Sequence, residues 1–221
     1  MYDETDKINS ILGIDDAFKA PMRLMEILLD KQVRESIFAQ FLGLVNYKLD
    51  KDFWHIYYQE ETAQRKKLKQ DFTPMSVSRL ATQLASNGED SGMRFEAAAG
   101  TGGMTIAMWA LDRARHMPWN YKPSQYLYVC EELSDRAFPF LVFNMVIRGM
   151  NGAAVHCDSL TRDCHGVFFI QNDDEHPAGF SNINVLPYSK DTEEFFNVTF
   201  TRQKYRHHIE SSLNLFGRGK A

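Results

Sequence analysis

The chain has 221 residues, of which 44% are hydrophobic, 13% aromatic and 24% charged. This composition is typical of a folded globular protein and excludes a wholly disordered one, because disordered chains have few aromatic residues. The 25 basic and 29 acidic side chains give a formal net charge of −4, which excludes a nucleic-acid binder that is basic throughout and leaves room only for a local basic face.

The first 65 residues have the periodicity of helices. Apolar side chains recur at three- and four-residue spacing in residues 22–29 and again in residues 33–45, and a further helix is expected from Phe53 into the charged stretch 60–69. That helix has to end before Thr73-Pro74, because the residue before a proline disfavours the helical conformation. We therefore predict an N-terminal helical region over residues 1–65 and a second domain over residues 66–221.

In the second domain, short apolar strands alternate with helices. The spacing predicts strands over 93–98, 126–130, 152–157 and 166–171, helices over 104–116 and 134–150, and a further strand over 195–201. Such alternation favours right-handed crossovers and a largely parallel, buried sheet. The predicted fold class is α/β.

A polar residue ends each of the four main strands: Glu96, Glu131, Asp158 and Asn172. In a parallel sheet these ends meet at one edge, where ligands bind. Glu131 is able to accept hydrogen bonds from ribose hydroxyls, and Asp158 from the exocyclic amine of an adenine. The structural alternatives are a solvated carboxylate at a helix start for Glu131 and a turn or cap residue for Asp158.

A glycine cluster, Gly100-Thr101-Gly102-Gly103, lies between the first predicted strand and its helix. Glycines let the backbone approach a ligand and aim helix N–H groups at it, although a tight turn with close helix–sheet packing explains the cluster as well. The segment lacks the G-x-G-x-x-G spacing and a Walker lysine, which disfavours nicotinamide and P-loop ligands. An acid four residues before the glycines, Glu96, suits a nucleoside that carries an ammonium and a carboxylate, such as S-adenosylmethionine.

Two segments carry a resemblance to a known family. Residues 70–74 (QDFTP) and 95–104 (FEAAAGTGGM) resemble the N6-adenine DNA methyltransferases typified by the modification subunit of type I restriction systems. That family has a Phe-Thr-Pro segment upstream of an Asp-Pro-x-x-Gly-Thr-Gly-Gly loop, and the similarity covers residues 54–172. It implies a Rossmann-like S-adenosylmethionine-dependent methyltransferase sheet, here truncated, that methylates adenine N6 in DNA beside a specificity or restriction-modification subunit.

The resemblance also implies a role for each matching position. Residues 72–74 would line the methionine end of the cofactor, Glu96 would face its amino group, Glu131 would hold the ribose and Asp158 would meet the adenine. The positions expected to bind the cofactor are Phe72, Thr73, Pro74, Glu96, Ala98, Gly100, Thr101, Gly102, Gly103, Glu131 and Asp158. Asn172 would be the catalytic residue that positions the target amine.

The sequence departs from the family at two of these places. Glu96-Ala97 stands where the family has Asp-Pro, and Asn172 is followed by Asp173-Asp174 instead of Pro-Pro and an aromatic residue. Methyl transfer to an amine relies on positioning, so a displaced site would cost most of the rate. The alternative hypothesis is therefore an inactive, methyltransferase-like module from a phage or mobile element that binds or blocks a restriction or defence complex.

Other features concern localisation, partners and metals. The longest apolar run, Phe138–Ile147, is about half of what a bilayer requires, and the polar N-terminus is unlike a signal peptide, so we expect a cytoplasmic protein without a membrane segment. The basic residues within 202–220 are expected either to touch DNA phosphates or to form a solvated end. His156-Cys157 and Cys164-His165 offer zinc-type ligands, but adjacent strand residues point to opposite faces, and no metal site is expected.

Overall fold

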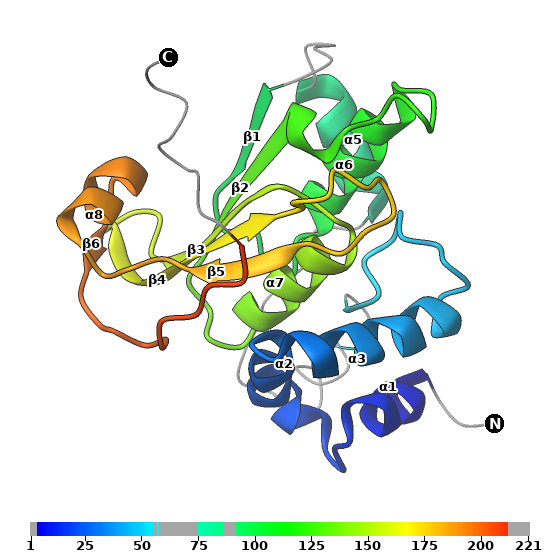
Figure 1. Cartoon of the computed structure of the whole chain (residues 1–221), viewed down its shortest axis with the longest axis horizontal. Helices are drawn as coiled ribbons and strands as arrows, with labels where there is room; N and C mark the ends of the chain where they lie inside the picture. The colour runs from blue at the N-terminus through cyan, green and yellow to red at the C-terminus, as the bar shows by residue number, and fades with distance from the viewer. Residues whose placement is uncertain (1–3, 55–56, 58–74, 86–91, 212–221) are drawn as a thin grey trace.

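The computed structural model describes residues 4–54, 57, 75–85 and 92–211. In this part of the chain a six-stranded sheet has the order β1-β2-β3-β4-β5, with β6 paired to β4. The helices that follow β1 and β2 cover one face of the sheet, and the N-terminal helices pack outside them (Figure 1). No helix among these residues is long and apolar enough to cross a membrane. The helices are α1 Glu4–Leu12, α2 Ala20–Leu28, α3 Lys31–Leu44, α5 Met75–Ala85, α6 Gly103–Ala114, α7 Phe138–Ile147 and α8 Lys190–Phe196, with short 3-10 turns η1 Ala17–Lys19 and η2 Pro123–Gln125. The strands are β1 Gly92–Glu96, β2 Tyr126–Glu132, β3 Gly152–Cys157, β4 Asp163–Gln171, β5 Asn182–Val185 and β6 Thr199–Phe200.

The predicted β-α-β-α-β unit is confirmed as β1-α6-β2-α7-β3. β1 and β3 both pair in parallel with β2, with Glu96 opposite Cys130 and Glu132 opposite His156. The carboxyl ends of these three strands therefore share one edge, and the α/β fold class is confirmed.

The prediction that β4 continues the parallel sheet is wrong. β4 runs antiparallel to β3, with Ala154 opposite Phe168. Only residues 158–162 connect the two strands, and a parallel crossover needs a dozen residues or more, so this connection can close only a hairpin. The carboxyl end of β4 consequently lies at the edge opposite to those of β1, β2 and β3.

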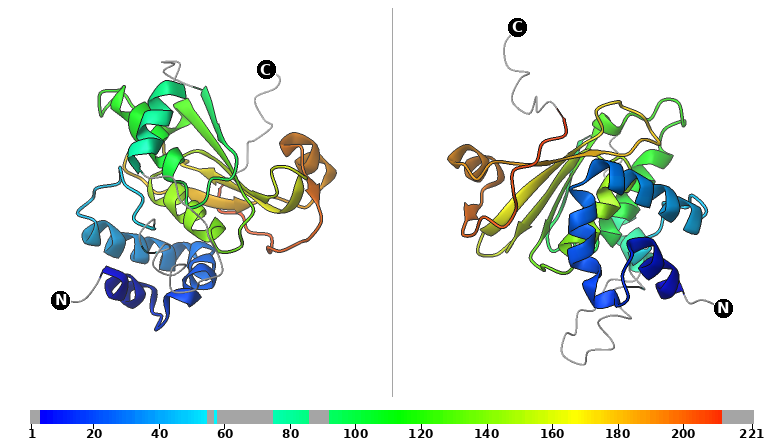
Figure 2. Two further views of the ribbon diagram at one scale, coloured as in Figure 1. Left: turned by 180° about the vertical axis from the view of Figure 1, so that it is seen from behind. Right: turned by 60° about the horizontal axis from the view of Figure 1, so that its bottom comes forward.

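The strands have apolar side chains on both faces and contribute to two cores. Toward the helices, Tyr128, Ala154 and Phe168 join the fully buried α7 and residues such as Leu24 and Phe38 of the N-terminal helices in one cluster. On the other face, a second cluster over β3 and β4 is covered from the α8–β6 side. Both views of Figure 2 place α1–α3 well apart from α8. The N-terminal helices and the sheet thus share a core, and the predicted boundary at residue 65 falls outside the described residues.

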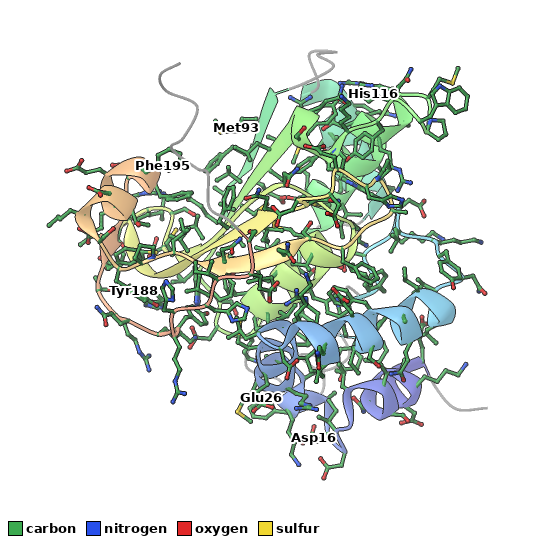
Figure 3. The ribbon with its side chains drawn as sticks, in the orientation of Figure 1. Asp16, Glu26, Met93, His116, Tyr188 and Phe195 are labelled. Carbon is green, nitrogen blue, oxygen red and sulfur yellow. The ribbon has the colours of Figure 1, made fainter. Side chains whose placement is uncertain are left out.

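The non-helical face of β1 and β2 is open to solvent. Met93 and Phe95 on β1 are 66% and 55% exposed, and Leu127 on β2 is 38% exposed. Figure 3 shows Met93 on the side of β1 away from His116, which follows α6.

Two further predictions need correction or fall outside the structure. The strand expected over 195–201 is limited to Thr199–Phe200, because Phe195 and Phe196 end α8. The Ser189 side chain caps this helix by accepting a hydrogen bond from the Thr192 N–H, which favours a helix where apolar content had suggested a strand. The helix predicted from Phe53 to residue 69 lies almost wholly outside the described residues.

Candidate cofactor site

The loop between β1 and α6 is a tight turn with several left-handed residues. Ala98, Gly100 and Gly102 have φ values of 55°, 60° and 92°. Gly102 precedes α6, and a Cβ atom there would lie 2.9 Å from Leu141 Cδ1 of α7. Close helix packing therefore accounts for Gly102, whereas Ala97 and Ala98 expose the outer side of the loop to solvent.

Glu96, the last residue of β1, is a buried carboxylate that forms no ion pair within the described part of the chain. It is 9% exposed and accepts a hydrogen bond from Thr105 Oγ1 of α6. The pKa of Glu96 is raised to about 7, chiefly by burial and in part by the nearby Glu132 and Asp52, although the hydrogen bonds from Thr105 lower it. Among the described residues, no basic side chain contributes to this shift, so a cationic group bound here would restore the charge of Glu96.

Glu132 holds the glycine loop from the end of β2. Its two carboxylate oxygens accept hydrogen bonds from the backbone N–H groups of Gly100 and Ser134, both at 2.7 Å. Each carboxylate oxygen has two lone pairs, so this side chain is able to accept further hydrogen bonds from ligand hydroxyls. The sequence analysis missed Glu132, although the adjacent acids at the strand end were visible and strand alternation allows only one of them to face α6.

The prediction that Glu131 shares a site with Glu96 is wrong in its orientation. Successive strand side chains point to opposite faces, so Glu131 points away from α6, toward the face of Val155. There it forms a two-pronged ion pair with Arg162, with N–O distances of 2.7 and 2.8 Å. Glu131 therefore ties the end of β2 to the β3–β4 connection.

Asp158 lies at the predicted edge, directly after β3, but its side chain serves the local turn. One carboxylate oxygen accepts hydrogen bonds from the N–H groups of Leu160 at 2.8 Å and Thr161 at 3.2 Å. These bonds hold the pKa of Asp158 below its usual range. The turn-residue alternative thus describes what Asp158 does here, and its contact with an adenine stays a prediction.

Asn172 does not lie beside Glu96, and this prediction is wrong because β4 is antiparallel. Asn172 is buried at the opposite edge, where its Nδ2 donates to the carbonyls of Gly149 at 3.3 Å and His176 at 2.9 Å. Its Oδ1 accepts the His176 N–H at 3.3 Å, and its own N–H donates to Asn151 Oδ1. Both the oxygen and the nitrogen of this side chain thus form hydrogen bonds with the loop after β4.

A buried polar network connects the glycine loop to α7 and to the segment around Asp52. Asp52 accepts hydrogen bonds from Thr101 Oγ1 at 2.5 Å and from Asn144 Nδ2 at 2.9 Å, and Asn144 also donates to the Thr101 carbonyl. Arg148, whose pKa burial lowers to about 9, donates to Asn144 and to the carbonyls of Leu49 and Lys51. Asp52 belongs to no motif and comes 49 positions before Thr101, so no sequence pattern indicates its contact with the loop.

The loop residues Gly100, Thr101, Gly102 and Gly103 connect Glu96 and Ala98 to the start of α6, and their contact with a cofactor stays a prediction. Phe72, Thr73 and Pro74 lie outside the described residues.

One comparison with known proteins, with a family model, agrees with the resemblance. A family model described as N-6 DNA Methylase matches residues 54–208, which is more than half of the chain. Among solved structures, the methyltransferase subunit of a type I restriction-modification system from Streptococcus thermophilus matches with 15% identity and a TM-score of 0.31 over 64% of this chain. The match covers 36% of that subunit, so the chain spans about a third of its length. The comparison with curated proteins found no match.

Proposed function

The chain belongs to the N-6 DNA methylase family, and from this premise we propose that it binds S-adenosylmethionine at the edge formed by β1 and β2 and acts in adenine-N6 methylation of DNA. The observation that carries the proposal is the Glu96 carboxylate, which is buried beside the glycine loop and lacks a cation among the described residues. S-adenosylmethionine supplies an electrophilic methyl group on a sulfonium, and its ammonium offers the missing positive charge.

The residues around Glu96 fit such a ligand. Glu96 would hold the ammonium, and the backbone from Ala98 to Gly103 would pack against the cofactor, because Ala98 is exposed and Gly100 and Gly103 are partly exposed. Glu132 replaces Glu131 as the candidate for the ribose hydroxyls, since it shares the helix-side face with Glu96. Asp158 for the adenine and residues 72–74 for the methionine end follow from the family resemblance.

Calorimetry with S-adenosylmethionine tests the binding claim. Glu96→Ala removes the carboxylate, and Gly100→Val places a β-branched side chain at φ 60°, in the loop that the ligand has to approach. We expect both variants to lose binding, with Glu194→Gln, an exposed acid on α8, as the matched control that keeps it. Equal heats from the wild type and both variants would refute the site.

The position of Asn172 favours a second candidate function for the same fold. Under this candidate the chain binds the cofactor without transferring its methyl group, and it binds or blocks a restriction or defence complex. The supporting observation is that Asn172 is engaged with Gly149 and His176, at the edge opposite to Glu96.

A methylation assay separates the two candidates. The isolated protein is incubated with tritiated S-adenosylmethionine and adenine-rich duplex or single-stranded DNA. Label in adenine N6 that is lost in Glu96→Ala supports the enzyme. Absence of label, together with retained cofactor binding and stoichiometric capture of a methyltransferase or restriction subunit, supports the second candidate.

A further inference from the structure

Three side chains with metal-binding atoms meet where β2, β3 and β4 come together on the helix side of the sheet. Asp135 follows β2, His156 is on β3 and His165 is on β4, and one ligand atom from each lies within 4.8 Å of the others. The Nε2 atom of His156 is 3.1 Å from Asp135 Oδ1, and the Nδ1 atom of His165 is 4.0 Å from the same oxygen. Two imidazoles thus face one carboxylate oxygen.

An irregularity in strand pairing brings the two histidines together. The register shifts between His156 and Cys157, so that His156 is opposite Gly166 while Cys157 is opposite Cys164. The two imidazole rings lie 4.9 Å apart in an edge-on arrangement. Both cysteines belong to the core on the other face. His156 and His165 therefore lie on the face opposite to the two cysteines, and no sequence pattern pairs them with Asp135.

The ring nitrogens of both histidines have surroundings that suit metal ligands. Nδ1 of His165 is buried and has no hydrogen-bond partner in the part of the chain that the structure describes, which leaves a desolvated polar atom facing Asp135. Nδ1 of His156 lies 2.6 Å from the Tyr205 hydroxyl, and such an outer partner fixes the ring while the other nitrogen binds an ion. That other nitrogen, Nε2, lies 3.0 Å from the Leu133 carbonyl.

We propose that Asp135, His156 and His165 bind a divalent transition-metal ion, with zinc as the best match. Zinc takes imidazole nitrogen and carboxylate oxygen at about 2.0–2.2 Å, so tetrahedral ligands lie roughly 3.3 Å apart. The separations of 3.1 and 4.0 Å need only a small movement of His165 and Asp135, both of which are partly exposed. Water or the Leu133 carbonyl completes the coordination.

Lys204 competes with the metal in this arrangement. Its Nζ lies 2.6 Å from Asp135 Oδ1, the oxygen that faces both histidines, so the ion pair has to open when the ion binds. Asp135 and Lys204 also line a pocket of about 680 Å³ between α2 and residues 204–206, which gives an ion access to the cluster.

Zinc titration of the chelator-treated full-length protein, in competition with a chromophoric chelator, tests the proposal. We expect one ion per chain, with affinity at least tenfold lower in His165→Ala and in Asp135→Asn. Lys204→Met should bind zinc several-fold more tightly, because it removes the competing cation, an effect that a purely structural role of the cluster would not produce. Asp163→Asn, an exposed acid at the start of β4, is the matched control and should bind as the wild type does.

Three outcomes would overturn the site. The first is that no stoichiometric zinc binding occurs. The second is equal affinity in the wild type, His165→Ala and Asp135→Asn, which indicates an adventitious ion held elsewhere. The third is a sulfur-to-metal charge-transfer band in the cobalt(II)-substituted protein, which would move the ligands to Cys157 and Cys164. Circular dichroism confirms that each variant is folded before its zinc affinity is measured.

Discussion

Replacing Glu96 by Gln should stabilise the free protein at neutral and alkaline pH while it weakens cofactor binding. The pKa of Glu96 rises from 4.5 to about 7 because the side chain is buried. One pKa unit corresponds to about 1.4 kcal/mol, so the ionised carboxylate costs the folded state about 3 kcal/mol. An isosteric amide keeps the volume and can still accept from Thr105, and it has no charge to bury.

The sign of the pH dependence follows from the raised pKa. Below pH 4.5 Glu96 is protonated in both the folded and the unfolded chain, and its favourable contribution is fully present. That contribution is lost as the pH rises through about 7, because the unfolded chain releases its proton first. Urea unfolding should therefore show a gain of about 3 kcal/mol for Glu96→Gln at pH 8 and almost none at pH 4.5.

The affinity for S-adenosylmethionine should rise with pH, whereas the contribution of Glu96 to stability falls. If the ammonium of S-adenosylmethionine faces ionised Glu96, the free protein has to release a proton on binding at any pH below about 7. The dissociation constant should then rise roughly 20-fold between pH 7.5 and pH 5.5, a range in which an α-amino group stays largely protonated. Calorimetry in buffers of different ionisation enthalpy measures both the affinity and the proton release.

Glu96→Gln is the control for this titration, and it should bind weakly with little dependence on pH. Equal wild-type affinity at the two pH values would show that the ammonium does not meet Glu96. Tight binding by Glu96→Gln would show that the charge of Glu96 does not contribute to cofactor binding. A stability gain without any change in binding would leave Glu96 a buried acid with no ligand.

The remaining predictions concern the two neighbouring acids and the helix start. Glu132→Gln should weaken S-adenosylmethionine binding at least tenfold by calorimetry, because an amide cannot accept both backbone N–H groups, whereas Glu131→Gln should change the affinity less than twofold. Arg162→Ala should lower the free energy of unfolding by about 3 kcal/mol in urea, because it leaves the buried Glu131 carboxylate without its partner. Gly102→Ala should cost about 1–2 kcal/mol by thermal unfolding, since its Cβ would meet Leu141 at 2.9 Å from a left-handed backbone. Equal affinities of the two glutamine variants, or an unchanged stability of either of the other two, would contradict the assigned contacts.

The sequence predicted those parts of the fold that depend on local patterns. Alternation of apolar strands and helices was enough for β1, α6, β2, α7 and β3, and β3 has the predicted bounds. The direction of β4 was also within reach, because a connection over residues 158–162 is too short for a parallel crossover. The strand-end rule alone places Asn172 at the wrong edge, because it takes no account of the length of this connection.

Other parts of the site depend on contacts between distant residues and leave no local pattern. Asp52 reaches Thr101 from the N-terminal region, and the Asp135 carboxylate meets His165 only because a shift in register turns that histidine toward the helix side. Neither contact is indicated by a periodic pattern or a motif in the sequence. Such residues become visible only once the strand order and register are known.

The end of β2 shows how one short acidic run can serve three different purposes. Glu131, Glu132 and Asp135 lie within five positions, and strand alternation followed by a turn sends them in different directions. Glu131 points to the outer face and pairs with Arg162, whereas Glu132 points to the helix side and accepts the Gly100 N–H. Asp135, past the strand end, meets the two histidines. The role of a carboxylate at a strand end thus depends on the face of the sheet to which it points. Glu132 points to the same face as Glu96, and it is therefore the candidate for the cofactor site.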